Sequence, residues 1–238
     1  MAKQDFALKT VMNQRTVLNQ IFNYAVLEGD IEYNPCSTIQ TPRNLKKSKR
    51  EAASKEDEAK VIEYKDLWIF PYIALMTGMR KGEILALQWK DIDFENNIIY
   101  VTKSIGHQGD RPFIKEPKTE AGKRIVPLLN DLKEFLLKQP NKKPDHFIVS
   151  DTGKEPLTNR RYQTLSKHYK EQTGTTCTAH RLRHSFATNA YEKNVDVKGI
   201  QEIVGHKHIS TTMNTYTHFR KESIKKAAEK LNGKSDKE

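Results

Sequence analysis

The sequence has few cysteines and no long hydrophobic run, and each shortage excludes a class of protein. Its 238 residues include two cysteines, Cys36 and Cys177, which form neither a disulfide framework nor a CxxC metal-binding pair. No stretch approaches the roughly 18 consecutive apolar residues that a transmembrane helix needs, and no secretory signal peptide precedes the first helix-like segment. The sequence therefore predicts a reduced, intracellular protein that does not span a membrane.

Acidic residues are outnumbered by basic ones. The chain has 41 Lys and Arg against 30 Asp and Glu, which gives a formal net charge of +11. Basic proteins bind nucleic acids by neutralising phosphates, although a lysine-rich surface also keeps a protein soluble. One short segment without hydrophobic periodicity concentrates this charge, and we interpret it as a linker that contacts the DNA backbone. Its basic residues are Arg43, Lys46, Lys47, Lys49 and Arg50.

Hydrophobic periodicity divides the chain into a short and a long unit. Apolar residues from Leu8 to Leu27 recur at spacings of three and four, which predicts an amphipathic helix with Gly29 at its C-terminal end. This segment is too small to bury a core of its own, so we interpret it as the end of a helical domain. The predicted division is a helical segment over 1–42, a basic linker over 43–53, a larger domain over 54–231 and a polar tail over 232–238.

The larger domain is predicted to be α+β, with far more helix than strand and one small antiparallel sheet. Helices are predicted over 67–77, 81–88, 129–137, 159–172, 180–192, 197–204, 210–216 and 220–231. Strands are predicted over 92–94, 98–103, 113–115 and 124–127, with turns at 95–97 and 120–122.

Common nucleotide and metal motifs are missing. The chain has no GxxxxGK[ST] phosphate loop and no HExxH zinc motif. His180 and His184 are four residues apart and could place two metal ligands on one helix face, but neither a glutamate base nor a third ligand accompanies them. We therefore expect no metal site and no cofactor.

Five short blocks occur in one order along the larger domain. They are TGMRKGEILAL from residue 77, PKT from residue 117, HRLRH from residue 180, VGH from residue 204 and TYTH from residue 215. Each block alone is common, but the ordered set resembles the tyrosine recombinases of the phage-integrase family. The resemblance covers about residues 54–231, and the N-terminal helix is similar to the end of that family's core-DNA-binding domain.

The resemblance implies a set of catalytic residues, all of which are present. They are Arg80, Lys118, His180, Arg183, His206 and the nucleophile Tyr216, with Glu83 at a supporting acidic position. The implied reaction cleaves one DNA strand through a 3′-phosphotyrosyl intermediate and then rejoins it. Lys115 and Lys123 compete with Lys118 for the lysine role, and His208 competes with His206.

The residue types suit this chemistry. Arginine presents a fixed fork of N–H donors to the non-bridging oxygens of a phosphate and stays charged. A tyrosine phenol, with a pKa near 10, needs a proton acceptor before it can attack, and His180 is predicted to be that acceptor. Lys118 is predicted to protonate the departing 5′ oxygen. Rejoining needs no ATP, because the phosphotyrosyl bond keeps the energy of the phosphodiester.

The resemblance also implies partners and a location. We expect double-stranded DNA with specific core sites, a homotetramer on DNA, accessory DNA-bending or excisionase proteins, and the cytoplasm and nucleoid of a bacterial host. A C-terminal apolar face would dock on a neighbouring subunit or on its own domain. That face comprises Phe219, Ile224, Ala227, Ala228 and Leu231.

Two alternative functions remain to be compared with this one, and the sequence also gives an expectation about the length of the protein. A non-catalytic DNA-binding protein of the same fold would keep the basic surface without the chemistry. A metal-dependent nuclease would need clustered carboxylates, which we do not find. We expect the chain to represent part of a longer integrase, and to bind DNA weakly with steep salt dependence.

Overall fold

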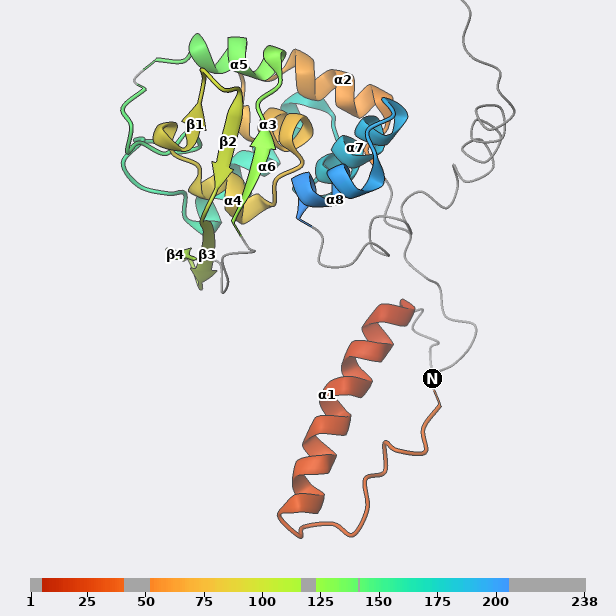
Figure 1. Ribbon diagram of the computed structural model, residues 1–238. Coiled ribbons are helices and arrows are strands. Elements are labelled where there is room, and N and C mark those ends of the chain that lie inside the picture. Colours follow the sequence, from red (N-terminus) through yellow and green to blue (C-terminus); the bar gives the residue numbers. More distant parts are fainter. Residues whose placement is uncertain (1–5, 41–51, 117–122, 141, 206–238) are drawn as a thin grey trace, which may run out of the picture. The chain divides into compact units, whose positions relative to one another are not determined.

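The computed structural model describes residues 6–40, 52–116, 123–140 and 142–205, in two compact units that divide between Arg50 and Glu51 (Figure 1). The first unit contains helix α1 (Leu8–Leu27), which confirms the predicted helix and its bounds. Gly29 adopts a positive φ of 81° just past the helix end, a conformation that glycine reaches without strain. No residue of α1 is buried, as expected for a segment too small to form a core.

Three helices open the second unit: α2 (Lys55–Glu63), α3 (Ile69–Thr77) and α4 (Lys81–Ala86). Sequence analysis missed α2, which begins where the Ser54 side chain accepts a hydrogen bond from the Asp57 N–H. α3 begins two residues later than predicted and ends at Gly78, whose φ is 63°. α4 is two residues shorter than predicted, because the chain then enters a 3₁₀ turn, η1 (Trp89–Asp91).

The strands form two small antiparallel sheets rather than the single sheet expected. One sheet has the order β1-β2-β5, with β1 (Ile92–Asp93), β2 (Ile98–Val101) and β5 (Arg124–Pro127). The other is a hairpin of β3 (Ser104–Gln108) and β4 (Arg111–Lys115). The predicted strand over 98–103 therefore ends early, and β3 follows it as a strand that sequence analysis missed. The predicted turn at 120–122 lies outside the described residues.

Four helices complete the described part of this unit: α5 (Asn130–Leu137), α6 (Asn159–Thr173), α7 (Ala179–Glu192) and α8 (Val197–Val204). Their bounds agree with the predicted helices to within one residue. The predicted helices over 210–216 and 220–231 lie outside the described residues. The α+β class with far more helix than strand is confirmed.

Helix α3 forms the centre of the hydrophobic core. Phe70, Tyr72 and Ile73 on this helix are almost fully buried, and α3 packs directly against α7. Phe186 on α7 and Ile200 on α8 belong to a second, smaller cluster beside it. Since burial of large apolar side chains is the main stabilising contribution, the core fixes the C-terminal end of α3, where the TGMR block begins.

Gly82 lies where α4 meets β3, and we expect Gly82→Ala to destabilise the second unit by about 1–3 kcal/mol. A Cβ atom there would lie 2.5 Å from the backbone oxygen of Ile105 and would also meet the Ser104 side chain. Neither backbone can move without disturbing the packing. Urea unfolding followed by the fluorescence of Trp68 and Trp89, the two tryptophans of the chain, measures the change.

Gly199→Ala is the matched control for this substitution. Gly199 is also helical, but its added Cβ would meet chiefly the side chain of Asp196, which can move. We expect little loss of stability there, because alanine is also the better helix former by about 1 kcal/mol. Equal destabilisation by the two substitutions would contradict the proposed close contact at Gly82.

Candidate active site

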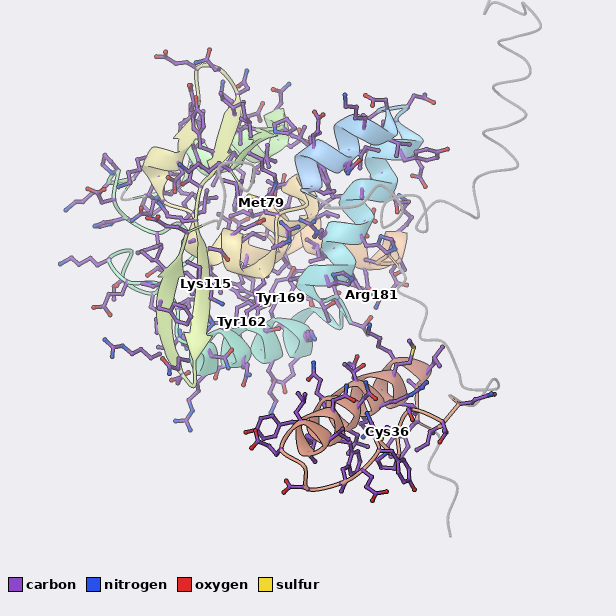
Figure 2. The ribbon with its side chains drawn as sticks, turned by 60° about the horizontal axis from the view of Figure 1, so that its bottom comes forward. Cys36, Met79, Lys115, Tyr162, Tyr169 and Arg181 are labelled. Atoms are coloured by element: carbon purple, nitrogen blue, oxygen red, sulfur yellow. The ribbon has the colours of Figure 1, made fainter. Side chains whose placement is uncertain are left out.

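Arg80 lies at the junction between α3 and α4. Gly78 ends α3, Met79 is buried within the second unit (Figure 2), and Arg80 is the residue from which α4 starts. The Arg80 side chain is 48% exposed. Its backbone N–H donates to Glu83 Oε2 at 2.7 Å and its Nη1 donates to Glu83 Oε1 at 2.8 Å. Glu83 therefore holds both the backbone and the guanidinium of Arg80.

Glu83 is buried and bears the negative charge of the cluster. Arg124 forms a bidentate ion pair with it, with Nη1–Oε1 and Nη2–Oε2 distances of 2.8 and 2.6 Å. Burial raises the pKa of Glu83, but the hydrogen bonds and charge of Arg124, followed by the bonds from Arg80, outweigh it and lower the pKa to about 2. Glu83 is therefore ionised throughout the neutral range.

Arg183 approaches the same place from α7 and is buried. Its Nη1 donates to the carbonyl oxygen of Gly78 at 2.6 Å. Desolvation and the neighbouring charge of Arg80 lower the pKa of Arg183 to about 9, against the opposing effect of Glu83. The guanidinium is thus still protonated at pH 7, and it ties α7 to the turn that presents Arg80.

The end of α8 is where these arginines converge. Three consecutive backbone carbonyls there accept hydrogen bonds from three arginines on three different elements. Ile203 accepts from Arg124 Nε at 2.8 Å, Val204 from Arg183 Nη2 at 2.5 Å, and Gly205 from Arg80 Nη2. The C-terminal end of a helix carries partial negative charge, so cations are favourable there. His206 is the next residue in the chain.

His180 lies in the first turn of α7, three residues before Arg183, and is exposed. Residues three apart on a helix are neighbours on its surface. The Thr178 side chain caps this helix by accepting from the Arg181 N–H. Asp57 on α2 fixes the preceding turn, because its carboxylate accepts from the Thr175 hydroxyl at 2.8 Å. The predicted histidine and arginine are thus presented from one well-supported helix start.

The remaining predicted site residues lie outside the described residues. They are Lys118, His206 and Tyr216 at the proposed site, and Arg43, Lys46, Lys47, Lys49 and Arg50 in the basic linker. In the sequence, Lys118 comes between β4, which ends at Lys115 (Figure 2), and β5, which begins at Arg124. His206 follows the end of α8 directly.

Arg124 is a residue of this cluster that sequence analysis missed. It was predicted only as the first residue of a strand, and β5 does begin there. Its partner Glu83 is 41 residues away, so no local pattern indicates the pair. The only hint in the sequence is an arginine that opens a short apolar strand.

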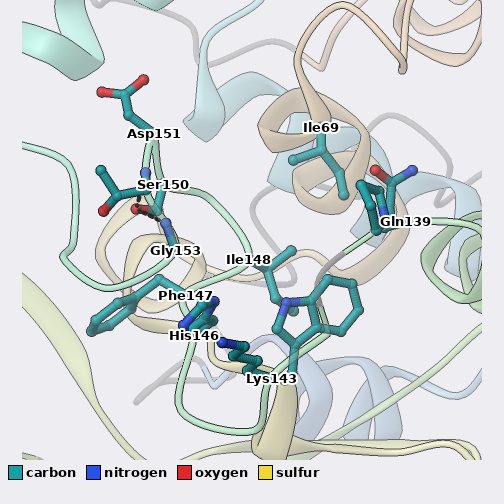
Figure 3. A pocket seen from close by; sticks show the side chains of 12 residues that line it. Ile69, Gln139, Lys143, His146, Phe147, Ile148, Ser150, Asp151 and Gly153 are labelled. Carbon is teal, nitrogen blue, oxygen red and sulfur yellow. Dashed lines mark hydrogen bonds between the residues drawn. The ribbon is translucent and has the colours of Figure 1, made fainter.

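The described residues include no group of three or more His, Cys, Asp or Glu side chains placed to hold a metal ion. A cavity of about 430 Å³ lies apart from the arginine cluster, between α3, η1 and the loop before α6. Figure 3 shows Ile69, His146 and Ile148 around it. Of the predicted catalytic residues that the structure describes, Arg80, His180 and Arg183 do not line this cavity. In the described part of the chain, no helix is both long and apolar enough to cross a bilayer.

Comparisons with known proteins identify the family. The sequence model of the phage integrase family matches residues 43–223, and the chain belongs to this family. The tyrosine recombinase XerC-like protein of Caldanaerobacter subterraneus subsp. tengcongensis is 29% identical, over 97% of this chain and 67% of that protein. The tyrosine recombinase XerA of Pyrococcus furiosus is 34% identical, over 66% of this chain and 51% of that protein. The chain thus spans about half to two thirds of these relatives.

Relatives and solved structures from mobile elements agree with this. The transposase of transposon Tn916 from Enterococcus faecalis is 26% identical over the whole chain and 65% of its own length. The Tn1549 transposon integrase, solved in complex with transposon right end DNA, has a TM-score of 0.74 and 25% identity, over 96% of this chain and 81% of that one. The fold and the sequence therefore define the class of tyrosine-type site-specific recombinases, enzymes that cleave and rejoin DNA. These similarities support that class over a non-catalytic DNA-binding protein.

Proposed function

We propose that this chain cleaves DNA by attack of Tyr216 on a phosphodiester, forms a 3′-phosphotyrosyl intermediate, and rejoins the strand without a metal ion. The observation that carries the proposal is that Arg80 and Arg183 both donate to backbone carbonyls at the end of α8, directly before His206 in the sequence, while Glu83 holds the Arg80 guanidinium. Fixed positive charge of this kind would stabilise a pentacoordinate phosphate bound there.

The two arginines differ in exposure, which suggests a division of labour in the proposed site. Arg80 is half-exposed and reaches the surface from the start of α4, whereas Arg183 is buried and bonded to two backbone carbonyls. A guanidinium has five N–H donors, and the described bonds of Arg183 to carbonyls use two of them. In our proposal both arginines donate to the non-bridging oxygens of the phosphate, and His206 adds a further donor.

Proton transfer is assigned to His180 and Lys118. His180 is exposed at the start of α7, and histidine is the side chain that most often acts as a general base. It can therefore accept the phenolic proton of Tyr216 as the bond to phosphorus forms. Lys118 then protonates the 5′ oxygen that leaves, and the reverse sequence rejoins the strand.

A nicked suicide substrate tests the proposal directly. Cleavage close to a nick releases a short oligonucleotide that diffuses away, so the covalent intermediate accumulates. We expect a protein–DNA band that survives SDS, with the label on the strand whose 3′ phosphate is attached. DNA binding with no such band under any condition would refute the proposed chemistry and favour a binding role.

Cleavage is expected to continue in excess EDTA. Arg80, Arg183 and Lys118 supply the positive charge that Mg²⁺ provides in two-metal nucleases, so the adduct yield should not change on chelation. The measurement is the SDS-stable band with EDTA and with added Mg²⁺. Complete loss in EDTA, restored by Mg²⁺ alone, would indicate a metal-dependent reaction instead.

Lys118→Ala is expected to cleave ordinary DNA very poorly, by about 10²–10⁴-fold if the lysine acts as a general acid. It should recover on a substrate whose 5′ bridging oxygen is replaced by sulfur, because a thiolate leaves without a proton. Lys115→Ala and Lys123→Ala are the matched controls from the same region. Recovery of one of these controls instead of Lys118→Ala would move the role to that lysine.

The assembly follows from the same proposal. We propose that residues 1–42 contribute part of a core-DNA-binding domain, that the basic linker over 43–53 contacts phosphates, and that 54–231 is the catalytic domain, followed by a tail over 232–238. Two DNA sites and a homotetramer would be needed for exchange between duplexes. Accessory DNA-bending or excisionase proteins would control direction, and the reaction would take place on the DNA of a bacterial host, in the cytoplasm or nucleoid.

A further inference from the structure

The side chain of Arg124 is held by several bonds within the described cluster. Arg124 opens β5, where it pairs with Val101 of β2, and its side chain is 9% exposed. Three hydrogen bonds hold its guanidinium: two to the carboxylate of Glu83 and one from Nε to the carbonyl of Ile203. The side chain therefore joins β5 to α4 and to the end of α8.

These contacts form a closed ring. Arg124 holds Glu83, Glu83 holds the backbone and guanidinium of Arg80, and Arg80 donates to Gly205 at the end of α8. Arg124 closes the ring through Ile203, two residues earlier on the same helix end. Gly205 also packs on Arg124, since a Cβ at this glycine would lie 3.2 Å from the Cδ of Arg124. A displacement of Arg124 would therefore shift both Arg80 and the residue before His206.

The guanidinium of Arg124 is committed to protein acceptors. Both of its terminal nitrogens bond the Glu83 carboxylate and its Nε bonds the Ile203 carbonyl, whereas the described bonds of Arg183 are two, both to backbone carbonyls. The charge of Arg124 nevertheless matters. Glu83 pairs with Arg80 and Arg124 and also acts electrostatically on the buried Arg183, so these four groups carry a net formal charge of +2. Such a cluster stays ordered only if each guanidinium is held by specific acceptors.

We propose that Arg124 is a positioning residue of the strand-cleavage reaction. It fixes the Glu83 carboxylate, and through it Arg80, against the end of α8 from which His206 follows. This rests on the proposed function. Arg124 itself does not touch the DNA, and its effect on the reaction passes through Glu83 and the α8 carbonyl.

The test compares Arg124→Met and Arg124→Lys in the full chain on the nicked substrate. We expect the cleavage rate constant at saturating DNA to fall by about 10²-fold in Arg124→Met, the size of effect that a misplaced catalytic group produces. The Kd for DNA should be nearly unchanged. Arg124→Lys should recover part of the rate, because lysine keeps the charge but lacks the fork that binds two oxygens.

Two comparisons separate positioning from general stability. Lys103→Met removes another shielded ion pair, between Lys103 and Asp91, whose side chains are 17% and 11% exposed; it should lower stability without lowering the rate constant of the folded protein. In a Glu83→Gln background, Arg124→Met should cause a smaller further loss of rate than it does in the wild type, since the ion pair is already broken and only the bond to Ile203 remains to be lost.

Each alternative outcome is decisive. The proposal would be overturned by a wild-type rate constant in Arg124→Met, or by weaker DNA binding with an unchanged rate constant in that variant. It would also be overturned if Lys103→Met lost as much rate as Arg124→Met. So would unfolding of both Arg124 variants at the assay temperature, because Arg124 would then be a folding determinant only. If the wild-type chain forms no adduct, both the proposed function and the positioning role of Arg124 are refuted. If the wild type is active and Arg124→Met is unimpaired, only the positioning role is refuted.

Discussion

Replacing Tyr216 by phenylalanine is expected to abolish the SDS-stable protein–DNA adduct completely while leaving the affinity for DNA nearly unchanged. In the proposed reaction the phenolic oxygen of Tyr216 supplies the only protein atom bonded to DNA. Phenylalanine keeps the ring and its packing but lacks that oxygen, and the arginine cluster that would hold the phosphate is intact. The nicked-substrate gel measures the adduct, and a mobility shift on the same DNA measures binding.

The matched control is Tyr100→Phe. Tyr100 lies on β2 and is 42% exposed, so loss of its hydroxyl should affect neither adduct nor binding. An adduct that persists in Tyr216→Phe would assign the nucleophile to another residue. Loss of both adduct and DNA affinity would mean that Tyr216 acts in binding, contrary to the proposed role.

Glu83→Gln is expected to give the largest loss of stability of any single change in the cluster, about 3–5 kcal/mol in the free energy of unfolding, because one partner of a buried ion pair is removed. The amide cannot balance Arg124, whose side chain is 9% exposed, or the buried Arg183. It also turns an NH₂ donor toward guanidinium donors. Urea unfolding at pH 7, followed by tryptophan fluorescence, gives the value.

The loss of unfolding free energy in Glu83→Gln should depend on pH, and it should be largest near neutral pH. The pKa of Glu83 is lowered from 4.5 to about 2 in the folded protein, so its ionised form stabilises the fold above the unfolded pKa. At roughly 1.4 kcal/mol per pH unit, this contribution is about 3 kcal/mol at neutral pH. It is lost as the pH falls from about 4.5 toward 2. The difference between wild type and Glu83→Gln should therefore narrow over that window.

Asp151→Asn provides a control with similar geometry and different burial. Asp151 forms a bidentate pair with Arg161 on the surface, and both side chains are nearly half exposed. Exposed pairs contribute about 0–1 kcal/mol, so this variant should lose far less stability. An equal loss in the two variants would show that burial is not what makes the Glu83 contact important.

Much of the fold could be predicted from local patterns. The periodicity of apolar residues predicted α1 and α8 with the observed bounds, and β5 likewise. Sequence analysis missed α2, because its residues are mostly charged and it contributes little apolar periodicity. The Ser54 cap and the acidic first turn were the available indications. The separation into two sheets depends on which strands pair, and pairing is a property of contacts distant in sequence.

The candidate site also depends on contacts between residues that are distant in sequence. The motifs predicted Arg80, Glu83, His180 and Arg183, and the structure brings Arg80, Glu83 and Arg183 together through specific hydrogen bonds. Arg124 could not be predicted, since its role depends on a bidentate fit to a carboxylate on another element. Side-chain charge is visible in a sequence, but the direction in which a guanidinium points is set only by tertiary packing.

The three carbonyls at the end of α8 also bear on how the site forms as the chain folds. Their arginine donors are 125, 79 and 21 residues away in sequence, so two of the three bonds close long loops. Contacts of such high sequence separation form late, because the loop entropy must be overcome first. The arginine cluster is therefore assembled only when α4, β5 and α7 have all docked on α8. Partly folded chains, including those still emerging from the ribosome, lack this ordered arginine cluster, and under the proposed function competence to cut DNA would arise together with the completed domain.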